Sequence, residues 1–268
     1  MKLLISAVFL SQLASSAMAG SLLLQSTTST KNSGLYSHLL PEFEAATGIR
    51  VNVVAVGTGQ AIKNAANCDG DVLIVHAKSA EENFVAMGGG LERHDLMFND
   101  FVIVGPENDP AGINGMADVS AALQAIEAAA LFASRGDDSG THKKEMTLWS
   151  AAGIDPTGAS GTWYRETGAG MGATLNTSVG MEAYVLTDRA TWITFGNKLD
   201  FVIHVEGNEA LFNQYGVIQV NPERCPQVNA EDARTFVNWL LSEDGQSKIS
   251  AYKVEDQQLF FPNAAQGE

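Results

Sequence analysis

Short apolar segments alternate with amphipathic helical segments along most of the chain, and this alternation constrains the fold more than any other feature. Leu22–Gln25 and Val51–Val56 have the length and apolar character of buried strands. Between them, apolar residues recur at helical spacing over 35–43, with Ser33 as the expected N-cap. Such alternation is typical of an α/β fold with mostly parallel sheets.

The same patterns predict the remaining elements. Further strands are expected at Asp71–Val75, Phe98–Gly105, Leu131–Ser134, Phe201–Val205 and Val217–Val220. Further helices are expected at Thr58–Ala66, Ser79–Met87, Ala117–Ala130, Ser139–Ala152 and Asn229–Leu241, with helical spacing also over 181–186. Gly158–Gly172 is predicted to be a loop and Asp109–Gly115 a crossover. The broken alternation predicts two α/β lobes with a ligand between them.

The N-terminus has the pattern of a signal peptide over residues 1–19. Lys2 supplies a positive charge, Leu3–Leu10 an apolar core, and Ala17-Met18-Ala19 a cleavage pattern before Gly20. A buried first helix is the alternative. No cysteine follows for a lipid anchor, and no later segment has the ~18 consecutive apolar residues of a membrane span. We therefore expect an exported, unanchored periplasmic protein.

Charge and cysteine content narrow the partners. The chain has 31 acidic and 16 basic residues, a net charge of -15, which argues against nucleic acid as a partner. Its two cysteines are too few for a structural zinc site. Export favours a disulfide between Cys68 and Cys225, with two unpaired buried thiols as the alternative.

The most informative segment is Ser134–His142, where a short strand ends in an arginine and a helix begins. The guanidinium of Arg135 presents a planar fork of donors that suits a tetrahedral oxyanion. Ser139, Thr141 and the backbone N–H groups at this helix start would complete a cage. The alternative is that Arg135 only pairs with one of the two aspartates that follow it.

Three other turns combine hydroxyls or glycines with a helix start. They are Ser26–Thr30, Gly57–Gly59 and Gly168–Thr174. A helix N-terminus offers free N–H donors and the positive end of a dipole, and glycine allows close approach of a ligand. Each turn taken singly is also an ordinary cap or strand–helix connection. None fits the dinucleotide fingerprint or a phosphate loop.

Several motifs together resemble the tungstate-binding proteins of bacterial ABC transporters. They are Thr27–Thr30, Ala55–Gln60, Asn99–Pro106, Asp109–Ile113, Ser134–His142, Gly170–Gly172 and Leu186–Arg189. The resemblance covers nearly all of the chain after the signal peptide. It implies a type II-like periplasmic-binding-protein fold, with a ligand cleft between two lobes joined by two hinge crossings. It also implies capture of tungstate and its delivery to a membrane permease.

The resemblance also implies a ligand-binding set and a division of the chain. The ligand shell would comprise Thr27, Thr28, Thr58, Arg135, Ser139, Thr141, Gly170, Gly172 and Thr174. The first turn reads Ser-Thr-Thr-Ser-Thr where members of the family often have three successive threonines. The sequence therefore leaves open, by one position, which of these hydroxyls faces the ligand. We expect lobe I to comprise residues 20–101 and 219–268, and lobe II residues 102–218. We also expect the protein to be a monomer that binds neither a metal cation nor a cofactor.

Three alternatives remain at this point. Tungstate at neutral pH is an unprotonated dianion, so its site needs only hydrogen-bond donors. Molybdate is the first alternative ligand, because it has nearly the same size and shape as tungstate. Phosphate keeps a proton that Asp137 could accept. A periplasmic phosphatase is less favoured, because Asp138, Ser139 and His142 share one turn and cannot form a Ser–His–Asp relay. The protein is therefore expected not to be an enzyme.

Overall fold

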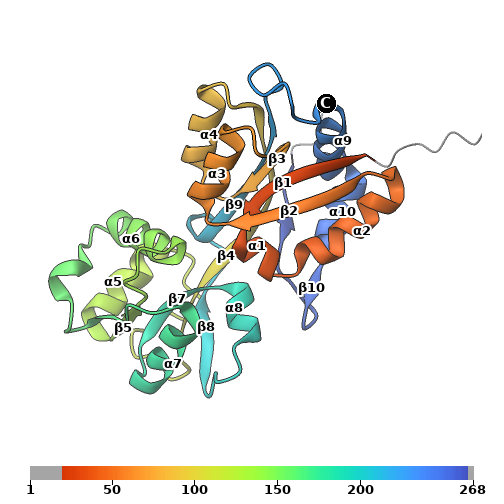
Figure 1. The fold of residues 1–268 in the computed structure, drawn as a ribbon. Coiled ribbons are helices and arrows are strands. Elements are labelled where there is room, and N and C mark those ends of the chain that lie inside the picture. Colours follow the sequence, from red (N-terminus) through yellow and green to blue (C-terminus); the bar gives the residue numbers. More distant parts are fainter. Residues whose placement is uncertain (1–19, 265–268) are drawn as a thin grey trace, which may run out of the picture.

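The protein folds into two α/β lobes in a computed structural model that describes residues 20–264 (Figure 1). The predicted signal peptide, residues 1–19, lies outside the described residues. Strands of both lobes join in one path with the order β2-β1-β3-β9-β4-β7-β5-β6, and β8 and β12 also pair with β4. The two-lobed α/β architecture expected from the sequence is confirmed.

The first lobe contains the N-terminal strands. Its sheet comprises β1 (Ser21–Thr27), β2 (Arg50–Val56), β3 (Val72–Val75), β9 (Phe212–Val220), the first part of β4 (Gly90–Pro106) and β12 (Phe261–Pro262). β1 pairs in parallel with β2 and β3, so the carboxyl ends of these three strands meet at one edge of the sheet, called the first edge below. β9 runs antiparallel between β3 and β4.

The second lobe is built around the other half of β4. Its sheet adds β5 (Phe132–Ser134), β6 (Tyr164–Glu166), β7 (Tyr184–Asp188) and β8 (Phe201–Val205). β5 pairs in parallel with β6 and β7, while β7 and β8 are antiparallel to β4. The carboxyl ends of β5 and β6 therefore form the second edge at which strand–helix turns gather.

A single long strand joins the lobes. Gly90–Asp100 of β4 pair with β9, and Phe101–Pro106 pair with β7 and β8. The chain returns from the second lobe through η2 (Glu209–Leu211) into β9. The prediction of a crossover at Asp109–Gly115 was wrong: this turn lies within the second lobe, where the hydroxyl of Tyr184 donates to Asp109 (2.6 Å).

Helices cover both sheets. In the first lobe they are α1 (Thr28–Asn32), α2 (Leu35–Thr47), α3 (Thr58–Ala66), α4 (Lys78–Ala86), α9 (Ala230–Leu241) and α10 (Glu243–Ala251), followed by a hairpin of β10 (Lys253–Val254) and β11 (Gln257–Gln258). In the second lobe they are α5 (Val119–Ala129), α6 (Gly140–Ala151), η1 (Pro156–Ala159), α7 (Met171–Met181) and α8 (Arg189–Thr194). Among residues 20–264, no helix combines the length and apolarity that membrane crossing requires.

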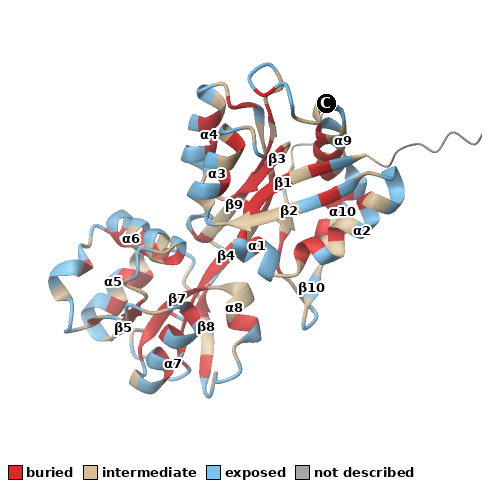
Figure 2. Ribbon diagram, in the orientation of Figure 1, coloured by how far each residue is buried: buried red, intermediate tan, exposed pale blue. Residues whose placement is uncertain are grey.

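Each lobe has a hydrophobic core of its own, and Figure 2 shows that strands of both lobes are buried. In the first lobe, Leu24 and Ile74 of the sheet pack with Phe43 of α2 and Phe236 of α9. In the second, aromatic side chains including Trp149, Tyr164 and Tyr184 pack around the short strands. Burial on this scale contributes about 1.5–3 kcal/mol for each large apolar side chain.

Three local predictions were wrong. The segment 181–186 does not continue a helix, because α7 ends at Met181 and β7 starts at Tyr184. The residue that caps α2 is Gly34, whose φ of 85° is accessible to glycine, and Ser33 instead ends α1. The segment 158–172 is not all loop, because it contains β6, whose three residues pair with β5.

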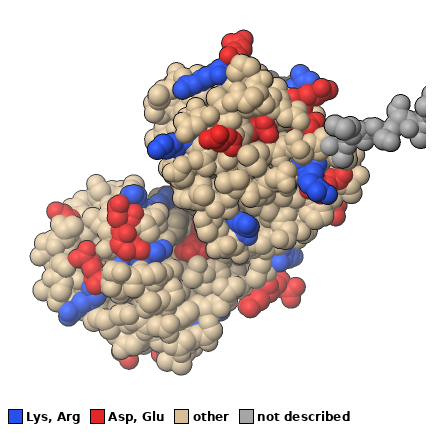
Figure 3. Space-filling view, in the orientation of Figure 1, with Lys and Arg blue, Asp and Glu red and all other residues tan. Residues whose placement is uncertain are grey.

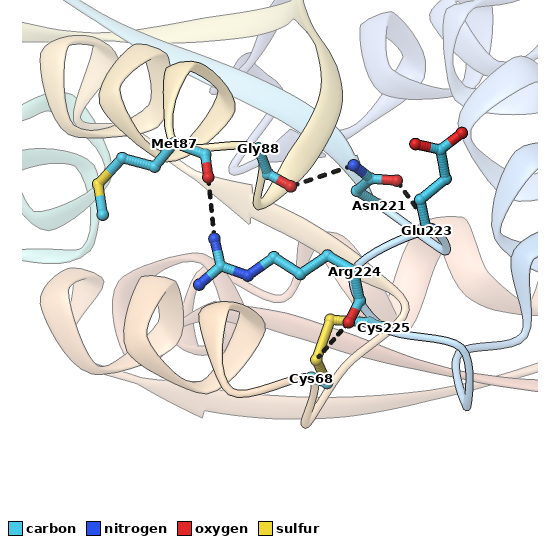
Figure 4. The surroundings of a disulfide bond; sticks show 7 residues. All are labelled: Cys68, Met87, Gly88, Asn221, Glu223, Arg224 and Cys225. Atoms are coloured by element: carbon cyan, nitrogen blue, oxygen red, sulfur yellow. Dashed lines mark hydrogen bonds between the residues drawn. A yellow bond between two sulfur atoms is a disulfide. The ribbon is translucent and has the colours of Figure 1, made fainter.

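Cys68 and Cys225 form a disulfide in the first lobe, as expected (Figure 4). Cys68 follows α3 and Cys225 lies between β9 and α9, 157 residues later, with 5.4 Å between the Cα atoms. The side chain of Arg224 donates to the carbonyl of Met87 (2.9 Å), and that of Asn221 donates to Gly88 (3.1 Å). The bridge and these bonds hold α3, α4 and the β9–α9 segment together.

Candidate functional site

The first group of predicted site residues lies at the carboxyl edge of β1 and β2. Thr27 ends β1 and its register partner Val56 ends β2, so the turns after these strands are neighbours. The hydroxyl of Thr27 bonds with those of Ser29 (3.0 Å) and Thr30 (2.7 Å). Thr27 and Thr30 are buried and Thr28 is exposed. Thr27 therefore shapes the turn, while Thr28 faces solvent.

The helix that follows β2 starts without a side-chain cap. Gly57 is the N-cap of α3 and has an extended backbone, and no side chain bonds to the first N–H groups of this helix. Thr58 is its first residue and is half-buried. An uncapped N-terminus leaves donors and the positive end of the dipole available to an anion. Thr58 adds a neutral hydroxyl beside those donors.

The second group lies at the carboxyl edge of β5. The Arg135 side chain is 19% exposed, and one of its terminal nitrogens donates to Asp137 (2.6 Å). The Nε atom of the same guanidinium is buried and has no partner among the described residues. A buried guanidinium nitrogen without an acceptor is costly, so this geometry leaves Arg135 with a donor for an oxyanion.

Asp137 orients Arg135. Its carboxylate accepts from Arg135 and also from the backbone N–H of Ser139 (3.2 Å). Burial alone would raise the pKa of Asp137, but hydrogen bonds from Ser139 and Arg135 outweigh it and hold the pKa below its usual range. The carboxylate is therefore ionised at neutral pH and engaged with groups of its own turn.

Ser139 and Thr141 lie at the start of α6. Ser139 is the N-cap, and its hydroxyl accepts from the backbone N–H of His142 (3.3 Å). The imidazole Nδ1 of His142 in turn accepts from the backbone N–H of Asp138 (3.0 Å). Thr141, the second residue of α6, is buried. The side chains of this turn thus hold its own backbone in place.

The glycine-rich start of α7 adjoins the Arg135 turn. Gly170 is the N-cap of α7 and offers no side-chain cap, and Gly172 adds open space beside the helix start. The hydroxyl of Thr167 donates to the carbonyl of Ser134 (3.1 Å), which joins the two turns. Thr174 is fully buried, and its hydroxyl bonds with that of Thr167 (2.8 Å). Its contacts are those of a residue that braces the turn.

The predicted residues thus form two clusters, one in each lobe. Thr27, Thr28 and Thr58 lie on the first edge, and the other six lie on the second. Among residues 20–264, no hydrogen bond or salt bridge joins the two clusters directly. Figure 3 shows the surface hollowed between the lobes, with charged side chains of both signs spread over this face.

The first edge also carries a polar group that was not predicted from the sequence. His76 directly follows β3; its imidazole lies 3.4 Å from the hydroxyl of Ser29, and its ring centroid is 4.8 Å from that of Tyr215. Burial lowers the pKa of His76, which favours its neutral form. Asn213 of β9 bonds to Asn99 of β4 nearby (2.9 Å). The position of His76 immediately after a strand, as with Thr27, was the signal available.

No group of three or more His, Cys, Asp or Glu side chains is arranged to hold a metal ion in the part of the chain that the structure describes. Among the predicted site residues, the donors at the two edges are backbone N–H groups, hydroxyls and the guanidinium of Arg135. Such a set suits a ligand that only accepts hydrogen bonds.

The chain is similar to several known proteins. Residues 14–244 match the model of the PBP superfamily domain. The chain is 50% identical over 251 residues to the tungstate-binding protein TupA of Peptoclostridium acidaminophilum, covering 92% of this chain and 87% of that protein.

Two solved structures are similar. The tungstate-binding protein TupA from Desulfovibrio alaskensis G20 has a TM-score of 0.88 and 46% identity, over 92% of this chain and all of that one. The tungstate ABC transporter structure from Geobacter sulfurreducens has a TM-score of 0.71 and 46% identity, over 87% of this chain and 98% of that one. The chain therefore belongs to the periplasmic-binding-protein superfamily and, within it, to the family of the tungstate-binding proteins.

Proposed function

We propose that this protein captures tungstate and delivers it to the membrane permease of an ABC importer. The observation that carries the proposal is the Arg135 guanidinium, whose Nε is buried beside two helix N-termini and has no acceptor within residues 20–264. The relatives named for tungstate binding share about half of their residues with this chain. A donor-only site suits a dianion that carries no proton.

The proposed contacts come from both lobes. Arg135, Thr141 and the N–H groups around Ser139, Gly170 and Gly172 bind oxyanion oxygens from the second lobe. On the first lobe, Thr28 and Thr58 donate from their hydroxyls, and Thr27 holds the turn. Thr174 supports the Gly170 turn from behind. Closure of the two lobes brings these groups together around the anion.

The division into moving lobes is also a proposal. We assign 20–101 and the C-terminal part to the first lobe, with the second lobe starting at 102. At the return crossing, the pairing of β9 with β3 favours a boundary nearer Phe212 than the expected residue 219.

The protein acts as a monomer in the periplasm after cleavage of the signal peptide at residues 1–19.

Phosphate binding is not favoured, because both Asp137 oxygens already accept bonds from Arg135 and Ser139. A phosphatase is not favoured either, since Ser139 accepts from the N–H of His142 and the His142 Nδ1 accepts from Asp138. With these contacts, the imidazole of His142 is not placed to take a proton from the hydroxyl of Ser139 as a general base. We propose a binding protein with no catalytic activity.

The experiment is a calorimetric titration of the chain from Gly20 with tungstate, molybdate, phosphate and sulfate. We expect one tungstate per protein molecule and much weaker binding of phosphate and sulfate. Tight phosphate binding without a response to tungstate would overturn the proposal. Turnover of a chromogenic phosphate ester, with and without added divalent metal, tests for catalysis, and we expect none above background.

A further inference from the structure

A buried carboxylate lies directly behind the second edge. Glu145 is on α6, four residues after Thr141, which is about 6 Å along the helix axis. The residue is only 2% exposed. It therefore shares the helix whose N-terminus faces the proposed anion, and it points into the interior of the lobe.

Three donors hold the carboxylate of Glu145. They are the hydroxyl of Tyr164 (2.6 Å), the hydroxyl of Ser134 (2.9 Å) and the indole N–H of Trp149 (3.3 Å). The Ser134 hydroxyl oxygen also accepts from the backbone N–H of Gly136 (3.1 Å). One hydroxyl thus connects Glu145 to the backbone on both sides of Arg135, so the carboxylate fixes the turn that carries the guanidinium.

No cation in the described part of the chain pairs with this carboxylate. None of the salt bridges among residues 20–264 involves Glu145. On α6 itself, Lys144 donates instead to the carbonyl of Phe212 (3.0 Å), and the Nδ1 of His142 accepts from a backbone N–H. From β6, Glu166 adds a second negative charge, and the guanidinium of Arg165 donates to the carbonyl of Gly161 (2.6 Å).

The other neighbouring elements do not supply a counter-charge either. The acidic side chain of α5, Glu127, is exposed. On β7, the Tyr184 hydroxyl donates to Asp109 (2.6 Å), and Asp188 is the N-cap of α8, whose carboxylate accepts from the backbone N–H of Thr191 (2.8 Å). The charged groups around Glu145 are therefore either negative or engaged elsewhere.

Burial raises the pKa of Glu145 to about 7, although bonds from Tyr164, Ser134 and Trp149 favour the ionised form. A dianion bound at the start of the same helix repels the ionised carboxylate and favours its protonated form. Tungstate carries no proton, so the proton that Glu145 takes up comes from solvent.

We propose that Glu145 is a positioning residue of the oxyanion site, and that the protein takes up a proton at Glu145 when it binds tungstate. This inference rests on the proposed function. By linkage, affinity is highest where Glu145 is already protonated and falls as pH rises through its titration range. The same carboxylate that fixes the Arg135 turn thereby makes binding depend on pH.

The test measures tungstate binding by calorimetry from pH 6.5 to 8.5, at each pH in HEPES and in Tris, whose ionisation enthalpies differ. For the wild type we expect net uptake of a fraction of a proton per tungstate near pH 7. We also expect a Kd about three- to tenfold higher at pH 8.5 than at pH 6.5. Glu145→Gln should remove both effects, and the matched control Glu127→Gln, an exposed change on α5, should retain them.

The wild-type measurement needs no variant, so the inference stays testable if Glu145→Gln does not fold. Tyr164→Phe is a second variant: loss of its bond to the carboxylate should shift the pH dependence to higher pH. Absence of proton uptake in the wild type would overturn the inference, as would uptake lost in His142→Gln or His76→Gln but kept in Glu145→Gln. No tungstate binding at any pH would overturn the proposed function itself.

Discussion

The two edges of the proposed site differ in how they favour an anion. The first edge offers hydroxyls, an uncapped helix and a histidine whose neutral form is favoured by burial. The second adds a full positive charge on Arg135 and, behind it, the buried acid Glu145. In the proposed function, charge on one lobe and neutral donors on the other divide two tasks: the second edge attracts the dianion, and the first completes its shell on closure.

The largest expected effect is the loss of the charged donor. Arg135→Ala should weaken tungstate binding by about 4 kcal/mol, roughly a thousandfold, because charge-assisted bonds contribute about 1.5–3 kcal/mol each. Calorimetry gives the Kd, and Arg234→Ala on the exposed face of α9 is the control. An unchanged Kd would show that Arg135 only pairs with Asp137 and that the second edge does not hold the charge.

The next effect concerns stability rather than binding. Cys68→Ala/Cys225→Ala should lower the free energy of unfolding by about 3 kcal/mol, because the bridge closes a loop of 157 residues. Tungstate affinity should stay within about twofold, since the bridge lies within the first lobe. Denaturant unfolding and calorimetry check the two parts. A large loss of affinity would mean that the bridge shapes the first edge.

Glu145 should make the second lobe less stable as pH rises. Its pKa is raised from 4.5 to about 7 by burial, so between these values the folded protein holds a proton that the unfolded chain has lost. Stability is therefore expected to fall by about 2 kcal/mol from pH 4.5 to pH 7 through this group. Denaturant midpoints of the wild type and Glu145→Gln across this range measure it. Parallel pH curves for the two proteins would contradict the assignment.

The smallest effect is expected on the first edge. Thr58→Ala should weaken tungstate binding by about 1 kcal/mol, roughly fivefold, because a neutral hydroxyl contributes less than a charged donor. Thr235→Ala on α9 serves as the control. A loss as large as that of Arg135→Ala would reverse the comparison between the two edges.

The sequence predicted those parts of the site that are local along the chain. The Arg135 turn was recognisable because strand, arginine and helix start are consecutive, and Thr27, Thr58 and Gly170 lie at similar turns. Glu145 was not recognisable, because its environment depends on Tyr164, 19 residues later, and on the pairing of β5 with β6. The neighbourhood of His76 likewise depends on Tyr215 of β9, 139 residues later.

The fold shows the same limit. The α/β alternation was visible as local periodicity, but the long strand β4 was predicted only in its apolar part, because Gly90–Met97 includes charged residues that the ladder with β9 accommodates. The segment 181–186 was apolar enough for either structure, and only its pairing between β4 and β5 makes it a strand.

Diffraction from crystals grown with tungstate, collected at a tungsten absorption edge, tests the central claim most directly. We predict one strong anomalous peak between the lobes, with an anion oxygen within hydrogen-bonding distance of the Arg135 Nε and others reached by donors of both edges. A peak that contacts one edge only, or that lies away from Arg135, would contradict the account.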